Sequence, residues 1–191
     1  MKNIIVSGYF APLHLGHLDY LRAAKAMGDR LFVIVNSDKQ TIMKGSIPFM
    51  DEKTRYNIVK NLKCVDNTLI SIDNDSSVSK SIEYIHQVYH ERGDKWWFVN
   101  GGDRSFAQDI HETGVCCSHD IEIKLGVGGT KKTDSSSKII ERAARKWISN
   151  NHSQIDIITI TKYIKSHLYD KLSLDTKNEL NKVLHNMKQG L

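Results

Sequence analysis

The 191-residue sequence has no long apolar run and only three cysteines. No stretch approaches the roughly 20 apolar residues that a membrane-spanning helix needs, and the N-terminal MKNIIVSGYF is too short for a signal peptide. Cys64, Cys116 and Cys117 are odd in number and two of them are adjacent, which fits neither a disulfide framework nor a zinc site. We therefore expect a protein without a membrane span in a reducing cytoplasm.

The sequence also lacks a basic arm. Its net charge of +5 comes from 27 basic and 22 acidic residues that are scattered along the chain. Nucleic acid and a small phosphorylated substrate would be served equally well by this charge, so the charge alone does not choose between them. With 40% hydrophobic residues and no internal repeat, the composition suits one α/β-sized domain with a small appendage.

Apolar runs of strand length alternate with stretches of helical spacing along residues 1–149. Two buried-looking strands are expected at 3–7 and 30–36, and Leu18, Leu21 and Ala24 recur between them at the spacing of a helix. The other expected elements are strands at 67–72, 95–99 and 121–125, and helices at 51–63, 78–91 and 135–149. This alternation predicts an α/β fold: a Rossmann-like three-layer sandwich with a mostly parallel five-stranded sheet.

The alternation stops near residues 149–151. Residues 150–191 read as a helical C-terminal extension with two short helices, at 159–171 and 175–187. We therefore predict a domain at residues 1–149 that is complete without the extension at 150–191.

Two histidines, His14 and His17, stand where the first strand gives way to the first helix. A helix that begins near Leu13 would place both on one face of its first turn, where backbone N–H groups and the helix dipole suit an anion. Gly8 would let the backbone approach that anion, and Gly16 would keep side-chain bulk away. Two imidazoles could then donate hydrogen bonds to phosphate oxygens. The alternative is a surface pair, or one histidine packed against the sheet; no third ligand lies nearby, so a metal site is not expected.

Two motifs carry a resemblance to a known family. Gly8-Tyr9-Phe10 followed by His14-Leu15-Gly16-His17 resembles the G-x-F…H-x-G-H signature of the cytidylyltransferase-like nucleotidyltransferases. Ser135-Ser136-Ser137-Lys138-Ile139 resembles the family's second signature, a serine- and threonine-rich motif that opens a late helix. The stretches between them (GDRLFVIVNSD, KGSIPFMDEKTRYNIVKNLKCVD and VNGGD) are also similar to the family, so the resemblance covers residues 1–145.

The resemblance implies nucleotidyl transfer. In this reaction a phosphate on an acceptor attacks the α-phosphate of a nucleoside triphosphate and pyrophosphate leaves. By the same resemblance, His14 and His17 would stabilise the transition state and the leaving group, and Lys44 would contact the phosphates; all three are predicted catalytic residues. Catalysis would then consist of positioning and charge neutralisation. Mg²⁺ is expected with the triphosphate, held by phosphate oxygens and water, so no metal ligand is predicted in the protein.

The remaining predicted site residues surround the nucleotide. The turn at 101–103 would approach a base or ribose, the alternative being a tight turn with a solvated aspartate. The serines at 135–137 would bind the β- and γ-phosphates, the alternative being a plain helix cap. Arg55 and Lys132 are predicted to bind substrate phosphate, although Arg55 could instead pair with Asp51 or Glu52. The predicted nucleotide-binding residues are Gly8, Tyr9, Phe10, Gly16, Gly101, Gly102, Asp103, Ser135, Ser136 and Ser137.

The substrates are predicted from finer likenesses. GDRLFVIVNSD and the GGD turn look most like the heptose-phosphate adenylyltransferases, which implies ATP and a sugar 1-phosphate, and we favour this reading. EKTRYNIVKNLKCVD is equally similar to cytidylyltransferases, which implies CTP with glycerol 3-phosphate or phosphoethanolamine. A nucleotide-binding regulator without turnover is the alternative of another class, and the intact His14/His17 pair argues against it. Because the family commonly pairs, we also expect a homodimer, and no nucleic-acid partner.

Overall fold

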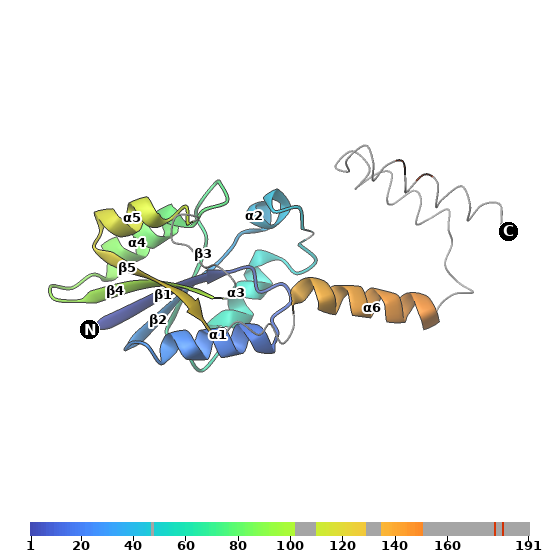
Figure 1. Ribbon diagram of the computed structural model, residues 1–191, viewed down its shortest axis with the longest axis horizontal. Coiled ribbons are helices and arrows are strands. Elements are labelled where there is room, and N and C mark those ends of the chain that lie inside the picture. The colour runs from blue at the N-terminus through green and yellow to red at the C-terminus, as the bar shows by residue number, and fades with distance from the viewer. Residues whose placement is uncertain (47, 102–109, 129–134, 151–177, 179–180, 182–191) are drawn as a thin grey trace. The chain divides into compact units, whose positions relative to one another are not determined.

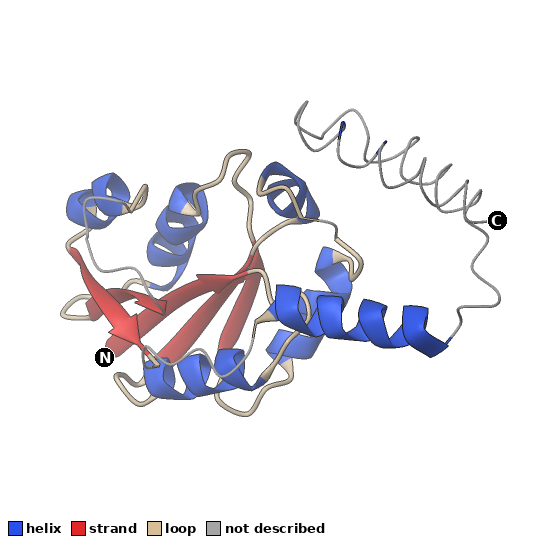
Figure 2. Cartoon of the chain, turned by 45° about the vertical axis from the view of Figure 1, so that its right-hand side comes forward, coloured by secondary structure: helices blue, strands red, loops and turns tan. Residues whose placement is uncertain are grey.

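Five parallel strands form one sheet in the computed structural model of the protein (Figure 1 and Figure 2). All four neighbouring pairs run parallel, which confirms the predicted α/β, Rossmann-like sheet. The strands, in the order β3-β2-β1-β4-β5 across the sheet, are β1 (Lys2–Gly8), β2 (Arg30–Val35), β3 (Asn67–Ile70), β4 (Lys95–Gly101) and β5 (Ile121–Val127).

Helices cover both faces of this sheet and complete three layers. They are α1 (Leu15–Lys25), α2 (Asp38–Met43), α3 (Glu52–Lys60), α4 (Ser79–Tyr89) and α5 (Thr113–Ser118), and α6 (Ser136–Asn150) follows β5. Because side chains alternate along a strand, Ile4 and Val6 of β1 face one layer and Ile5 faces the other. The face of the sheet with Ile4 and Val6 packs against Leu21 of α1 and Val59 of α3, and the face with Ile5 is covered by α4 and α5.

The structure describes residues 1–46, 48–101, 110–128, 135–150, 178 and 181. The chain divides into two units, Met1–Ile139 and Ile140–Leu191. The predicted helices at 159–171 and 175–187 lie almost entirely outside the described residues, and the domain boundary at residue 150 stays a prediction. In the described part of the chain, no helix has the length and apolar character that crossing a membrane requires.

The strand order places a topological switch between β1 and β4. From β1 the chain winds through β2 and β3 on one side, and then crosses to β4 and β5 on the other. The two strands are in register up to Val6 and Val99, so their carboxyl ends lie side by side. In open α/β sheets, ligands bind outside the carboxyl ends of the strands at such a switch.

Two helices were absent from the elements expected from sequence. The segment 37–50 reads as a polar loop, yet it contains α2, which begins with a capping box: the Ser37 hydroxyl accepts from the Gln40 amide, and Gln40 Oε1 accepts from the Ser37 amide. Gln40 is also buried and donates to the carbonyls of Asp75 and Ser77, so a polar residue anchors this helix. The other, α5, is only six residues long.

Candidate active site

The two predicted histidines meet at the start of α1. His14 is the N-cap residue, and its carbonyl accepts from the amides of His17 at 2.9 Å and Leu18 at 3.2 Å. One turn of helix therefore separates the two side chains, and their rings stack with centroids 3.8 Å apart and an angle of 25° between the planes. The helix begins at Leu15 rather than near Leu13, but the two imidazoles still lie together.

Phe10 forms a wall behind His17. Its ring is 1% exposed and meets the His17 ring edge-on, with centroids 5.1 Å apart. A Cβ atom on Gly8 would lie 2.7 Å from Phe10 Cζ, so the space that Gly8 leaves is filled by this ring. The sequence predicts that Gly8 makes room for a ligand; in the structure it instead makes room for Phe10. Gly8 and Phe10 therefore influence the site by the packing of the Phe10 ring against His17. Gly16 lies in the first turn of α1, between the two histidines.

Burial sets the protonation state of His17. Burial first, and then charge repulsion from the neighbouring His14, lower the pKa of His17 from 6.5 to about 4. His17 is therefore neutral at neutral pH. Its Nδ1 atom is buried and has no hydrogen-bond partner among the described residues. A phosphate group placed beside this ring would favour its protonated form, because the opposite charge offsets the cost of burial.

Lys44 approaches the same loop from α2. It is the residue that ends this helix, and its ammonium lies 4.4 Å from the centroid of the Tyr9 ring. A cation over an aromatic face is attracted to it. Tyr9 directly follows β1, so this contact holds a positive charge above the loop that carries the histidines. The structure thus brings Lys44 and Tyr9 together at one end of the sheet.

The second motif is joined to the first by one hydrogen bond. Ser136 Oγ, in the first turn of α6, donates to the Pro12 carbonyl at 3.1 Å. Ser135 Oγ accepts from the Lys138 amide at 3.2 Å, which is the helix-capping role predicted as the alternative. Ser137 also lies in the first turn of α6. The serine motif therefore adjoins the histidine loop, as a shared phosphate site requires.

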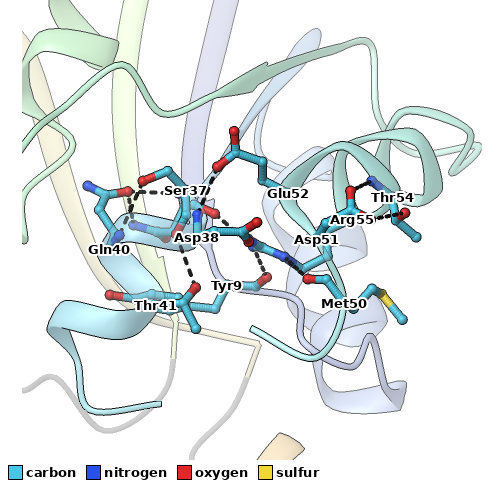
Figure 3. Close-up of polar contacts among 11 residues, drawn as sticks. Tyr9, Ser37, Asp38, Gln40, Thr41, Met50, Asp51, Glu52, Thr54 and Arg55 are labelled. Atoms are coloured by element: carbon cyan, nitrogen blue, oxygen red, sulfur yellow. Dashed lines mark hydrogen bonds and ion pairs between the residues drawn. The ribbon is translucent and has the colours of Figure 1, made fainter. Parts of the chain in front are cut away.

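Arg55 is buried inside the loops around the site (Figure 3). Its side chain is 1% exposed. It donates to four groups, namely the carbonyls of Met50 (2.9 Å, from Nε), Tyr9 and Asn36 (both 2.7 Å, from Nη1) and the carboxylate of Asp38 (2.6 Å, from Nη2). These partners come from the loop after β1, the loop after β2 and the segment before α3. Arg55 therefore ties three connections together.

This geometry corrects the predicted roles of Arg55. Its ionic partner is Asp38 rather than Asp51 or Glu52. Asp51 instead caps α3 by accepting from the Thr54 amide and hydroxyl, which lowers the pKa of Asp51, and Glu52 accepts from the Asp38 amide. A guanidinium that is buried and bonded to four protein groups is not presented to a substrate phosphate. We therefore assign Arg55 to the support of the loops.

Near its carboxyl end, β4 contains a residue to which the sequence analysis assigned no role. Asn100 is 7% exposed, and its Nδ2 atom is buried with no hydrogen-bond partner in the described part of the chain. Its neighbour Gly101 is described, whereas Gly102, Asp103 and Lys132 lie outside the described residues. The available signal was position: Asn100 is a polar residue at the carboxyl end of an apolar strand that borders the switch. Its amide is a donor placed where a ligand is expected.

Metal ligands are not clustered here. Among the residues that the structure describes, no group of three His, Cys, Asp or Glu side chains could hold a metal ion. A magnesium ion held by phosphate oxygens and water would need no such cluster.

Comparison with known proteins places the chain in a family. The model of the family described as cytidylyltransferase-like matches residues 5–142. The FAD synthase of Methanocorpusculum labreanum is 31% identical over 148 residues, which cover 76% of this chain and 98% of that relative. The FAD synthase of Thermoplasma acidophilum is 37% identical over 75 residues, which cover 39% of this chain and 53% of that relative.

A solved structure is also similar. The lipopolysaccharide core biosynthesis protein from Thermoplasma volcanium superposes with a TM-score of 0.51 and 26% sequence identity, over 70% of this chain and 99% of that one. The family match spans both motifs. The chain therefore belongs to the cytidylyltransferase-like family and is a nucleotidyltransferase.

Proposed function

We propose that the protein transfers the adenylyl group of ATP to the phosphate of FMN, forming FAD and releasing pyrophosphate. The observation that carries the transfer is the stacked His14/His17 pair at the start of α1, beside the switch between β1 and β4. The choice of ATP and FMN is supported by the two relatives described above, both of them FAD synthases and one matched over 98% of its length.

The described residues suit each part of this reaction. An oxygen of the acceptor phosphate attacks the α-phosphorus of ATP, and the bond from that phosphorus to the bridging oxygen of the β-phosphate breaks. His14 and His17 would donate hydrogen bonds to phosphate oxygens on which charge grows, and a neutral His17 does so through its one ring N–H. Lys44 adds a positive charge over the same loop. Mg²⁺, bound through the phosphates, would supply further charge neutralisation.

A sugar 1-phosphate is the second candidate acceptor. It is the acceptor that the sequence likenesses favour, and the similar structure from Thermoplasma volcanium is that of a lipopolysaccharide core biosynthesis protein. With either acceptor the adenylyl group would come from ATP, and either acceptor would present a phosphate monoester to His14 and His17. They differ in the group attached to that phosphate, which is flat and aromatic in FMN and polar in a sugar.

A release assay separates these candidates. Pyrophosphate release by the full chain is measured with Mg²⁺ and either ATP or CTP, against FMN, heptose 1-phosphate, hexose 1-phosphate, glycerol 3-phosphate and phosphoethanolamine. We expect release with ATP and FMN alone, with FAD identified by chromatography. Release that requires a sugar 1-phosphate would favour the second candidate, and release with CTP would overturn adenylyl transfer. ATP binding without release in any mixture would identify a regulator.

The histidine variants complete this test. His17→Ala should abolish most of the release, whereas His111→Ala, which changes an exposed histidine outside the site, should leave it at the wild-type rate. Homodimerisation stays a prediction, which light scattering after gel filtration would measure.

A further inference from the structure

Tyr20 links α1 to the ends of two strands. It lies three residues after His17, and its hydroxyl donates to the Val99 carbonyl at 2.6 Å. A Cβ atom on Gly101, where β4 ends, would lie 2.7 Å from Tyr20 Cδ2. A Cβ atom on Gly128, just after β5, would lie 2.9 Å from Tyr20 Cα. Both glycines therefore let the backbone rest directly on Tyr20.

The sheet is irregular at the place where Tyr20 binds. Val99 pairs with Lys124, but Gly101 pairs with Val127, so β5 contains one more residue than β4 between these pairs. Such a bulge disrupts the hydrogen-bond ladder locally and turns the strand. The Tyr20 hydroxyl reaches the carbonyl at the edge of this disruption. The Tyr20 side chain of α1 thus holds the β4 backbone at the point where the hydrogen bonds between β4 and β5 are disrupted.

We propose that Tyr20 is a positioning residue of the nucleotide site. It fixes the ends of β4 and β5, at Gly101 and Gly128, relative to the histidines of α1, and so sets the distance between the backbone at Gly101 and the groups that hold the phosphates. The inference rests on the proposed nucleotide-binding role of the turn that begins at Gly101.

Two single variants test the contact from opposite sides. Tyr20→Phe removes the hydroxyl and keeps the ring, and should raise the Kd for ATP about fivefold. Gly101→Ala pushes a methyl group into that ring, and should raise the Kd about tenfold or more. The matched controls are Tyr84→Phe, on the exposed side of α4, and Gly114→Ala, where a Cβ atom meets nothing within 4 Å. Both controls should bind ATP like the wild type.

A double variant separates positioning from general loss of structure. In Tyr20→Ala/Gly101→Ala the clash is gone, so the combined rise in Kd should be smaller than the product of the rises measured in the single variants Tyr20→Ala and Gly101→Ala. KM for ATP should rise in Tyr20→Phe while kcat at saturating ATP stays near the wild-type value, because His14 and His17 are untouched. A merely structural role would lower the melting temperature and leave the Kd for ATP measured at low temperature unchanged.

The outcomes are distinct. Wild-type affinity for ATP in both Tyr20→Phe and Gly101→Ala, or single effects that multiply in the double variant, would overturn the role of Tyr20. A wild-type chain that binds ATP but makes no FAD would overturn FMN as the proposed acceptor. The role of Tyr20 would then still be decided by the Kd for ATP of the Tyr20 and Gly101 variants. A wild-type chain that binds neither ATP nor CTP would overturn both.

Discussion

Acidification from pH 7 to pH 5 is expected to destabilise the fold through the side chain of His17. Burial, followed by the charge of His14, lowers the pKa of His17 from 6.5 to about 4 in the folded state, whereas the unfolded chain keeps the ordinary value of about 6.5. Between these values the unfolded state binds a proton and the folded state does not. The free energy of unfolding is therefore highest above pH 6.5 and falls as the pH is lowered towards 4.

The size of the loss follows from the width of this interval. A difference of one bound proton is worth about 1.4 kcal/mol for each pH unit. The interval from 6.5 to about 4 thus corresponds to roughly 3 kcal/mol, of which about 2 kcal/mol is lost between pH 7 and pH 5. Because folded domains are stable by only about 5–15 kcal/mol, a loss of this size is measurable.

Urea unfolding at pH 7, 6 and 5, followed by the fluorescence of the buried Trp96, measures this loss. The wild type should lose about 2 kcal/mol more than His17→Gln over this range. His111→Gln, which replaces an exposed histidine, should behave like the wild type. Burial also lowers the pKa of His86, but its contribution is common to all three proteins and cancels in the comparison. Equal acid losses in the wild type and His17→Gln would refute the reasoning.

Three further predictions concern individual side chains. His14→Ala and His17→Ala should each lower pyrophosphate release by about 100-fold or more with the circular dichroism spectrum retained; unchanged release in both would contradict their roles. Arg55→Met should lower the free energy of unfolding in urea by about 3–5 kcal/mol, because buried partners lose their donor, whereas Arg145→Met, which breaks an exposed pair one helical turn apart, should cost about 0.5 kcal/mol; similar losses would contradict the assignment of Arg55. Asn100→Leu should raise the melting temperature and raise the KM for ATP, because it removes a buried donor that has no partner among the described residues; lower stability with unchanged KM would show that the amide is structural.

Most of the sheet could be predicted from the sequence because its strands are buried on both faces. Continuous apolar runs such as 3–7 and 30–36 mark such strands, and the structure extends the first only to Lys2–Gly8. Helix α2 could not be found in this way, because its anchor is the polar Gln40, which is buried by hydrogen bonds rather than by apolar contact. The capping box at Ser37 was the local signal for it.

The parts of the candidate site that could be predicted depend on residues close together in the sequence, and the parts that could not depend on residues far apart. The meeting of His14 and His17 follows from helical spacing alone, so residues three apart were enough to place them together. The role of Arg55 could not be predicted from spacing, because its partners lie on separate segments that only the fold brings together. The same holds for Gly101, whose missing side chain is explained by a tyrosine 81 positions earlier in the chain.

Because Arg55 holds the loops around the site in place, the segment that lies between two of its partners is free to vary in sequence. The segment 45–49 lies between two fixed points: α2, whose Asp38 is bound to Arg55, and Met50, whose carbonyl accepts from the same guanidinium. A surface segment with anchored ends can change in length and composition at little cost in chain entropy. The loops that Arg55 ties together would then stay in place while this segment is lengthened, shortened or exchanged.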